Sequence, residues 1–440
     1  MRTKLKQIWQ MLHQRRHWFW LGIGLKRWLL LIGVGAGIMG MGWVYLVLWL
    51  WQLGWLPRIV YDILTVQFLP SYLRVLVPLL VGSGLFLFGL GQLAGSMMAP
   101  FRSSERGLGK LLYQYKQRQR GPQVVAIGGG TGMPSLLRGI KAYTNNVIAI
   151  VTVADDGGSS GRLRRELGLL PPGDFRNNLV ALAEDETLMT QLVQYRFGGR
   201  LEGEKGGELQ GHAFGNLLIA ALAGITGSFE QGLAAAERVL ALRGRVMPST
   251  MDEVTLVGEV LVVDEDGRER LKRVVGESAI PKAGGKVKRV LLEPEHVRAY
   301  PPVVRAILQA DLIVLGPGSL YTSILPNLLV PGVAQALAQA SAPKVYICNV
   351  ADQKGETSGY TVSDHVYALW KHVPQSCVTV VLANNNFKGQ EDGEKKKIQF
   401  VAVDEVDGAV VRSRDLVDED KPWRHDSEKL ARAVMELLWS

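Results

Sequence analysis

The residues best suited to chemistry in this sequence lie in two glycine-rich loops. Residues 128–132 are Gly-Gly-Gly-Thr-Gly, and residues 316–323 are Gly-Pro-Gly-Ser-Leu-Tyr-Thr-Ser. Glycines let backbone N–H groups approach a phosphate closely, and a helix that follows such a loop directs its positive end at the anion. The first loop lacks the Gly-Lys-Ser/Thr of a Walker loop and the third glycine of the dinucleotide fingerprint. Each loop follows a short apolar run, so we predict phosphate-binding loops at the ends of two strands.

A pair of carboxylates, Asp155 and Asp156, follows the second apolar run. We expect residues 157–162 to form a flexible run that carries the hydroxyls of Ser159 and Ser160 and a guanidinium. Such groups bind sugar hydroxyls, orient a divalent ion or act as a base, and a solvated turn is the structural alternative. Dinucleotide-binding folds place a ribose-binding acid ~20 residues after the first loop, which favours contact with a ligand.

Three further segments carry polar residues near predicted strand ends. Asp174, Arg176 and Asn177 lie at the start of a predicted helix, which Asp174 could simply cap. His212 is predicted to be structural, whereas Asn216, near the start of an apolar helix, is the better ligand candidate. Asn349 ends another predicted strand. We find no Ser-His-Asp arrangement and no metal-binding cluster in these segments.

The elements that must position these residues alternate between strand and helix. Short apolar runs separated by helical patterns, such as 333–340 and 363–372, predict an α/β fold with a Rossmann-like, doubly wound, mostly parallel sheet. The strand candidates are 124–127, 146–154, 287–292, 312–315, 344–347 and 378–382. Residues 254–263 and 271–275, on either side of an Asp-Gly turn, predict an inserted β-hairpin. The glycine-rich, charged stretch 198–211 predicts a mobile loop.

Two long uncharged stretches near the N-terminus predict a membrane anchor. Residues 28–51 and 75–100 contain no charged side chain, and as helices each is long enough to cross a hydrocarbon core of ~30 Å. Tryptophans cluster near the ends of the first stretch, as interfacial aromatics do. We therefore expect four parts: a basic cytoplasmic arm (1–27), a two-helix transmembrane hairpin (28–100), a basic linker (101–121) and a globular domain (122–440).

The charge distribution predicts the orientation of this anchor. Residues 1–121 hold 15 Lys and Arg against Asp62 and Glu105, a net charge of +13, and the whole chain carries +9, which leaves −4 for residues 122–440. Basic residues concentrate before the first stretch and after the second. The positive-inside rule then places both termini and the globular domain in the cytoplasm, at the inner (cytoplasmic) membrane. A cleaved signal peptide and a buried helical hairpin are the alternatives, and the presence of a second long stretch disfavours the former.

The composition of the globular part narrows its partners and its compartment. Its net negative charge argues against a nucleic-acid partner, which would require a basic face, whereas the basic arm suits an anionic membrane surface. Cys348 and Cys377 stand alone in apolar runs. This pattern predicts buried thiols in a reducing compartment rather than a disulfide framework or a metal site.

Six motifs, in this order along the chain, resemble the gluconeogenesis factor family of YvcK type, which is related to CofD, the 2-phospho-L-lactate transferase of deazaflavin cofactor synthesis. The motifs are 128–132, 155–161, 173–177, 214–216, 316–323, and 348–350 together with 355–357. The resemblance extends from about residue 124 to residue 382, and segments 243–250 and 364–366 resemble the YvcK branch. A membrane hairpin is not part of the usual family pattern. Residues 350–352 are Val-Ala-Asp where that branch usually has Leu-Met-Thr.

This resemblance implies a Rossmann-like fold and a UDP-sugar ligand such as UDP-N-acetylglucosamine. It also implies a role in cell shape, in wall synthesis and in growth on gluconeogenic carbon sources. Carried over by position, the phosphate contacts fall on Gly129, Gly130, Thr131 and Gly132, and Asp155 and Asp156 occupy the place where the transferases hold the acceptor. The predicted ligand-binding residues further include Ser159, Ser160, Asp174, Arg176, Asn177, Asn216, Gly316, Gly318, Ser319, Tyr321, Thr322 and Asn349.

Two classes of function remain open at this point. In the first, the domain is a regulator: a UDP-sugar occupies the site without a cofactor, and the domain relays the level of this sugar to partners at the membrane. We expect a homo-oligomer, with wall-synthesis proteins as partners. In the second, the domain is a transferase that moves a phospholactyl or phosphoenolpyruvyl group from a nucleotide donor to a deazaflavin-type acceptor. Asp155 or Asp156 would then position the acceptor or Mg²⁺. A nicotinamide dehydrogenase is a distant third class, because the glycine fingerprint does not fit it.

Overall fold

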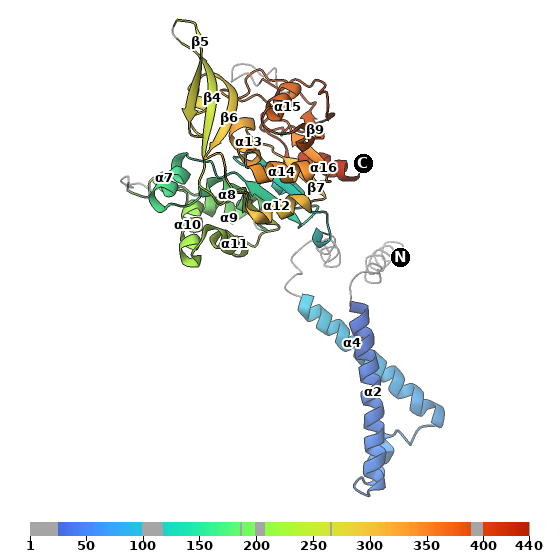
Figure 1. Cartoon of the computed structure of the whole chain (residues 1–440). Coiled ribbons are helices and arrows are strands. Elements are labelled where there is room, and N and C mark those ends of the chain that lie inside the picture. Colours follow the sequence, from blue (N-terminus) through green and yellow to red (C-terminus); the bar gives the residue numbers. More distant parts are fainter. Residues whose placement is uncertain are drawn as a thin grey trace. The chain divides into compact units, whose positions relative to one another are not determined.

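The computed structural model describes residues 25–98, 118–184, 187–198, 207–264, 266–388 and 399–439 of the 440-residue chain. The chain divides into two compact units between Tyr115 and Lys116, an N-terminal helical unit and a C-terminal globular unit (Figure 1). Most of the predicted basic arm and linker lie outside the described residues, and so do residues 199–206 of the predicted mobile loop.

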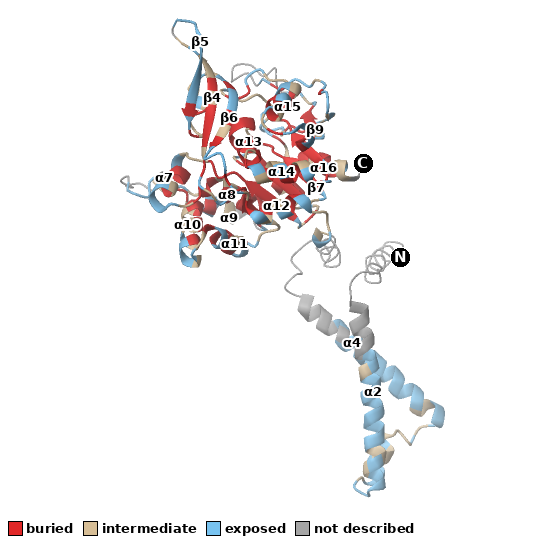
Figure 2. Ribbon diagram, viewed as in Figure 1, coloured by how far each residue is buried: buried red, intermediate tan, exposed pale blue. Residues whose placement is uncertain are grey.

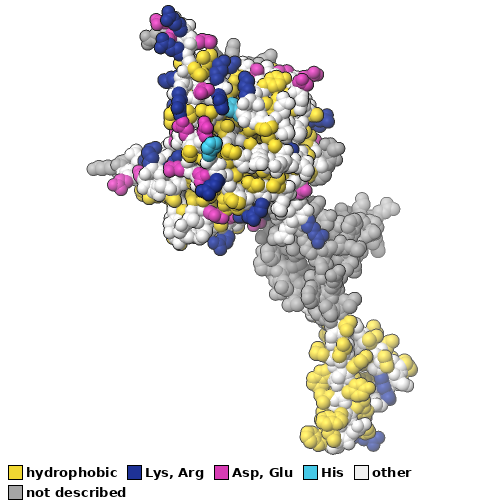
Figure 3. All heavy atoms as spheres, viewed as in Figure 1, with side chains coloured by type: hydrophobic (Ala, Val, Ile, Leu, Met, Phe, Trp, Pro, Cys, Tyr) yellow, Lys and Arg dark blue, Asp and Glu magenta, His cyan; other side chains and the backbone are white. Residues whose placement is uncertain are grey.

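Three helices form the described part of the N-terminal unit: α2 (Leu25–Gln52), α3 (Arg58–Leu64) and α4 (Ser71–Met98). The stretches Gly33–Gln52 and Ser71–Gly89 are long and apolar enough to cross a membrane, and no part of either is buried. Exposed residues cover this hairpin (Figure 2), and hydrophobic side chains predominate among them (Figure 3). The two predicted apolar helices are therefore present.

Seven strands form the main sheet of the globular unit (Figure 1). They are β1 (Val124–Gly128), β2 (Val147–Val151), β3 (Arg245–Pro248), β7 (Leu312–Leu315), β8 (Lys344–Ile347), β9 (Val380–Asn384) and β10 (Val410–Arg414). Their order is β10-β9-β8-β7-β1-β2-β3, and all six pairings are parallel. Every residue of β1, β7 and β8 is buried, as near-continuous apolar strands require (Figure 2). The predicted doubly wound α/β fold is confirmed.

Helices cover both faces of this sheet because the strand order reverses beside β1. The chain runs outward from β1 to β3, returns to β7 on the other side of β1 and runs outward again to β10. Right-handed crossovers that run in opposite directions place their helices on opposite faces. The helices and short turns are α6 (Met133–Ile140), α7 (Gly158–Leu167), α8 (Pro172–Leu182), α9 (Thr187–Gln194), α10 (Phe214–Thr226), α11 (Phe229–Val239), η3 (Pro281–Ala283), α12 (Pro301–Leu308), η4 (Leu320–Ile324), α13 (Leu325–Leu328), α14 (Pro331–Gln339), α15 (Val362–Trp370), η5 (Gln375–Cys377) and α16 (Ser427–Trp439).

The inserted segment is a three-stranded antiparallel sheet rather than a two-stranded hairpin. Strands β4 (Thr255–Val263), β5 (Glu269–Val275) and β6 (Lys286–Glu293) pair in the order β5-β4-β6. The predicted hairpin corresponds to β4 and β5, and the prediction that residues 287–292 belong to the main sheet is wrong. Exposed positions interrupt the buried ones along β6, which suits a strand with one solvated face and not the interior of a parallel sheet.

Two strands of the main sheet, β3 and β10, have no counterpart among the predicted strands. Both lie at the edges of the sheet. Strand β3 has only four residues, and the Val-Val-Arg-Ser-Arg sequence of β10 has no buried residue. Their extended conformation is imposed by pairing with β2 and β9, which local composition does not reveal.

Close packing of α6 against α16 leaves no room for a side chain at Gly139. A Cβ atom there would lie 2.0 Å from the backbone oxygen of Ser427 and 2.5 Å from Cβ of Ala431. We expect Gly139→Ala to lower the free energy of unfolding by about 1–3 kcal/mol, because the added methyl group forces the two helices apart.

Gly224→Ala is the matched control, since Gly224 lies on α10 with nothing within 4 Å of its Cβ position. It should stabilise the protein by about 0.5–1 kcal/mol, because alanine restricts the unfolded chain more than glycine does. Thermal unfolding of the full chain in detergent micelles compares the two variants. Equal effects would contradict the packing argument.

Candidate functional site

The two glycine loops meet where the strand order of the main sheet reverses. Strands β1 and β7 are neighbours, and each glycine loop follows one of them. A Cβ atom at Gly132 would lie 2.7 Å from the backbone oxygen of Pro317 and 3.0 Å from Cα of Gly318. In open α/β sheets, ligands bind outside the carboxyl ends of the strands at such a reversal. The topology therefore brings both predicted phosphate-binding loops to the position that favours a ligand.

The first loop is held in shape by partners far away in the sequence. Gly130 has a positive φ of 64°, and its backbone N–H donates to Oδ2 of Asp174 at 2.7 Å. The side-chain amide of Asn327 donates to the backbone oxygen of Gly128 at 2.9 Å. Thr131, in the middle of the loop, is exposed. The loop thus presents one exposed hydroxyl-bearing side chain beside a left-handed backbone position that favours glycine.

Asp174 does not cap its helix, contrary to one of the predicted alternatives. It lies in the first turn of α8, whose preceding residue, Pro171, makes no side-chain cap. Its carboxylate binds the first loop instead, through the N–H of Gly130. Burial, and after it the negative charge of Asp155, raises the pKa of Asp174 to about 7, although the Gly130 N–H and Arg176 oppose the shift. Asp174 is therefore part of the loop's support and a titrating group near neutral pH.

The two adjacent carboxylates at the end of β2 have different environments. Oδ1 of Asp155 accepts from the N–H of Gly157 at 2.9 Å, and burial raises the pKa of this carboxyl. Oδ1 of Asp156 accepts from the N–H of Ser278 at 3.0 Å. A Cβ atom at Gly276 would lie 2.2 Å from Oδ2 of Asp156, so the backbone packs directly on this carboxylate. Asp156 therefore anchors the segment that follows β5, whereas Asp155 bonds within its own loop.

The predicted flexible run after Asp156 is in fact helical. Ser159 and Ser160 lie in the first turn of α7 and are buried. The Ser159 hydroxyl accepts from Nδ2 of Asn216 at 3.0 Å and lies 3.1 Å from Nδ1 of His212. His212 therefore has the structural role predicted for it. The prediction of a flexible run is wrong because a positive φ at Gly158 allows the chain to turn directly into a helix.

Arg176 connects this buried network to the carboxylates. It is 8% exposed and donates to Oδ1 of Asn216 at 3.1 Å and to Oδ1 of Asn177 at 3.0 Å. Its Nε atom has no hydrogen-bond partner among the described residues. The charges of Asp174 and Asp155 act on it and oppose the lowering of its pKa by burial. Arg176 therefore places a positive charge beside two acids and retains a free donor.

Residues of the second loop bind partners on the segment after β8. Nε2 of Gln353 donates to the hydroxyl of Ser319 at 2.9 Å, and Nδ2 of Asn349 donates to Oε1 of Gln353 at 3.2 Å. The carboxylate of Glu356 accepts from the Thr322 hydroxyl at 2.9 Å and from the backbone N–H of Tyr321. Tyr321 and Thr322 are buried, so they support the loop, whereas the half-buried Ser319 and Asn349 remain nearer to solvent.

One acid of this region, Glu277, was not predicted from the sequence. Burial, and after it the negative charge of nearby carboxylates, raises the pKa of Glu277 to about 8. Those carboxylates are Asp155, Asp174, Asp156 and Glu356. Glu277 lies in the insert, 121 residues after Asp156, and no local motif marks it. Only the contact between Ser278 and Asp156 reveals it.

The described residues contain no group of three or more His, Cys, Asp or Glu side chains arranged to hold a metal ion. A cavity of about 560 Å³ lies elsewhere, between residues 297–304 and α14, and contains none of the predicted site residues. The glycine loops and the acids beside them remain the candidate site.

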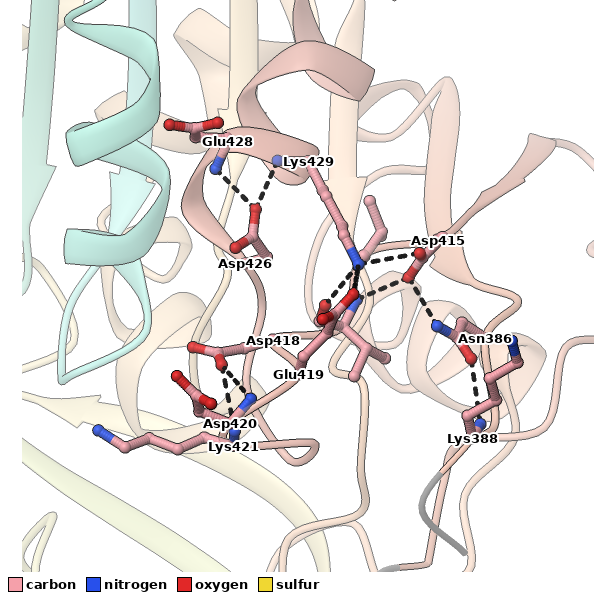
Figure 4. A network of polar contacts seen from close by, with 12 residues as sticks. Asn386, Lys388, Asp415, Asp418, Glu419, Asp420, Lys421, Asp426, Glu428 and Lys429 are labelled. Atoms are coloured by element: carbon pink, nitrogen blue, oxygen red, sulfur yellow. Dashed lines mark hydrogen bonds and ion pairs between the residues drawn. The ribbon is translucent and has the colours of Figure 1, made fainter.

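A second group of acids, at the far end of the same sheet, is neutralised by a cation. Nζ of Lys429 donates to Oδ2 of Asp415 at 2.9 Å and lies 3.7 Å from Glu419 (Figure 4). Asp415 also accepts from Asn386, which follows β9. Side-chain hydrogen bonds from Lys429 and Asn386 hold the pKa of Asp415 below its ordinary value, although burial opposes them. This network ties α16 to the ends of β9 and β10 and is structural.

Comparison with known proteins agrees with this geometry. A family model described as 2-phospho-L-lactate transferase CofD matches residues 124–435. Gluconeogenesis factors of Halalkalibacterium halodurans and Bacillus subtilis are 46% and 44% identical; the matches cover 71% and 72% of this chain and 95% and 98% of the relatives. A crystal structure of a UPF0052 family member from Bacillus halodurans, 47% identical, superposes with a TM-score of 0.64 and covers 71% of this chain and 99% of that chain.

The fold and the site thus define an α/β protein of the CofD family, and the chain belongs to this family. Within it, the chain belongs to the gluconeogenesis factors of YvcK type, as the resemblance predicted. A relative of the same group from Nostoc sp. (strain PCC 7120) is 42% identical over 96% of this chain and 93% of its own length. A match over 96% of this chain extends through most of the N-terminal unit as well as the globular unit.

The raised pKa of Glu277 generates a prediction on stability. The folded protein holds a proton on this carboxyl up to about pH 8, whereas the unfolded chain releases it near the ordinary value of 4.5. The free energy of unfolding of the native protein therefore decreases as the pH rises from about 4.5 to about 8. Glutamine at this position does not titrate, so the variant does not show this decrease. We expect Glu277→Gln to be increasingly stable relative to the native chain across this window.

Thermal unfolding of the full chain in detergent micelles at pH 5, 6.5 and 8 measures this difference. Glu295→Gln is the control, because Glu295 is exposed in the loop after β6, and its curve should follow that of the native chain. A difference between Glu277→Gln and the native chain that is constant with pH would show that this carboxyl does not titrate in the window.

Proposed function

We propose that the globular unit binds a UDP-sugar of the UDP-N-acetylglucosamine type and regulates cell shape and wall synthesis during growth on gluconeogenic carbon sources. The observation that carries this proposal is the contact between two glycine loops at the reversal of the strand order. Membership of the gluconeogenesis factors supports the wider physiological role.

The site combines two chemical environments that match the two ends of a nucleotide sugar. Backbone N–H groups of the first loop and the start of α6 favour phosphate. The acids Asp155, Asp174 and Glu277 supply acceptors and, where protonated, donors for hydroxyl and amide groups. A diphosphate linked to a sugar rich in hydroxyl groups fits such a division better than a ligand that is anionic throughout.

Thr131→Val tests the first environment. The loop hydroxyl is exposed, and the loss of one hydrogen bond to a charged phosphate should weaken the binding of UDP-N-acetylglucosamine about tenfold or more. Isothermal titration calorimetry of the full chain in detergent micelles measures the affinity. Thr255→Val, on β4, is the matched control and should bind like the native chain.

Parallel titrations with GTP and with a deazaflavin decide between the two classes of function. Saturable binding of the UDP-sugar that Thr131→Val weakens supports the regulator. A native chain that ignores UDP-sugars and binds only GTP or the deazaflavin would refute the regulator and favour a transferase.

The transferase is the second candidate because the matching family model is described as 2-phospho-L-lactate transferase CofD. In this candidate the loops hold the donor phosphates and stabilise the charge of the leaving group. Asp155 or Asp156 would position the acceptor, and each already accepts one backbone N–H, from Gly157 and Ser278 respectively. Formation of product from a nucleotide donor and a deazaflavin, lost in Asp155→Asn, would support it, and the absence of turnover would count against it.

We further propose that the N-terminal unit anchors the protein in the inner membrane with both termini in the cytoplasm. The two apolar helices of α2 and α4 carry the proposal, together with the basic residues that flank them. The guanidinium of Arg74 donates to side-chain and backbone oxygens of Gln67, each at 2.7 Å. These hydrogen bonds close the turn that leads from α3 into α4.

Single engineered cysteines test this orientation, because the native Cys348 and Cys377 are both fully buried. In cells that express the chain, a membrane-impermeant maleimide should label Ser71→Cys, at the start of α4, without permeabilisation. Ser358→Cys, exposed in the globular unit, should be labelled only after permeabilisation. The reverse pattern would place the termini outside.

A further inference from the structure

Glu277 differs from the other acids of the site in its hydrogen bonding. Each of the other four accepts at least one donor: Asp155 from Gly157, Asp156 from Ser278, Asp174 from Gly130, and Glu356 from Tyr321 and Thr322. Among the described residues, Glu277 has no hydrogen-bond donor and no ion pair, although it is half-buried. Its electrostatic neighbours are these four carboxylates.

The position of Glu277 is well defined by the residues on either side of it. Gly276 adopts a positive φ of 104° with its backbone against the Asp156 carboxylate, and the Ser278 N–H donates to the same group. Two residues further on, the fully buried Ile280 packs against Gly258 of β4. Glu277 is thus clamped between the small sheet and the end of β2.

The half-buried carboxyl of Glu277 has no protein donor among the described residues, whereas another group of acids in this fold does have donors. The acids around Lys429 are neutralised by its ammonium group and by backbone N–H groups (Figure 4). No such cation or donor reaches Glu277 in the described part of the chain. Acids whose pKa is perturbed by burial and by neighbouring charges cluster at functional sites, so Glu277 is a candidate for contact with a ligand.

We propose that Glu277 is a specificity-determining residue that binds the uncharged, hydroxyl- or amide-bearing part of the nucleotide-linked ligand. This inference rests on the proposed function and extends it to a residue outside the six motifs. The negative charge of the carboxylates around Glu277 disfavours a phosphate at Glu277 itself. A sugar supplies neutral O–H and N–H donors, so it can satisfy Glu277 without adding negative charge.

The raised pKa of Glu277 supports this role, because a protonated carboxyl both donates and accepts a hydrogen bond. An amide has the same capacity and a similar shape. Glu277→Gln should therefore preserve recognition of the sugar, and Glu277→Ala should weaken it. If the role of Glu277 were purely structural, its loss would affect the binding of a UDP-sugar and of UDP alike.

The test compares UDP-N-acetylglucosamine with UDP by calorimetry on the full chain in detergent micelles at pH 7, in the presence of EDTA. We expect Glu277→Ala to weaken binding of the UDP-sugar about tenfold, the effect of one or two lost hydrogen bonds, and to change the affinity for UDP less than about twofold. Glu277→Gln should retain the preference of the native chain for the sugar. Glu295→Ala, in the exposed loop after β6, is the control and should bind both ligands normally.

The outcomes separate this inference from the proposed function. If the native chain binds neither UDP nor the UDP-sugar, the proposed function fails and the inference fails with it. If the native chain prefers the UDP-sugar and Glu277→Ala keeps that preference, only the role of Glu277 is overturned. Equal weakening of both ligands would also overturn it, and so would an effect that appears only when Mg²⁺ replaces EDTA, because Glu277 would then act through a bridging cation.

Discussion

The direct contact between the loops that follow β1 and β7 is the constraint on which the rest of the globular unit depends. The backbone of Gly132 lies directly against residues 317–318, and a side chain at Gly132 would clash with the facing loop. The contact exists only because the strand order reverses between these two strands. It brings the backbone of one loop and the hydroxyl-bearing residues of the other together at the carboxyl edge of the sheet, where ligands of open α/β sheets bind.

The electrostatics of the site follow from this geometry. Asp174 supports the first loop through Gly130, and this position brings it next to Asp155, so that support of the loop and crowding of carboxylates arise together. Arg176 compensates in part from a buried network behind the loop. The small antiparallel sheet adds Glu277 to the same place through the contact between Ser278 and Asp156. The insert is therefore an extension of the site, although it lies outside the main sheet.

The two units of the chain differ in whether their apolar residues are buried or exposed. The globular unit buries its apolar strands under helices, whereas α2 and α4 expose theirs along stretches long enough for a bilayer (Figure 2). Relatives from Bacillus subtilis and Halalkalibacterium halodurans match the globular unit over almost their entire length, and the Nostoc relative matches both units. The globular fold thus occurs both in relatives that match 71% or 72% of this chain and in one that matches 96% of it.

The sequence alone determined the features that depend on short-range patterns. Apolar periodicity gave the α/β class and the two membrane-length helices, and glycine spacing located both loops at strand ends. Tertiary structure decided everything that depends on pairing between distant residues. Strand β6 pairs with β4 in the small antiparallel sheet and not with the main sheet. Strands β3 and β10 are extended because they pair with β2 and β9. Asp174 bound Gly130 rather than its own helix, and Glu277 joined the site from the insert. Such contacts form where the folded backbone brings a donor or a charge close to a residue that is distant in the sequence. Local composition cannot predict which distant residues will be close in space.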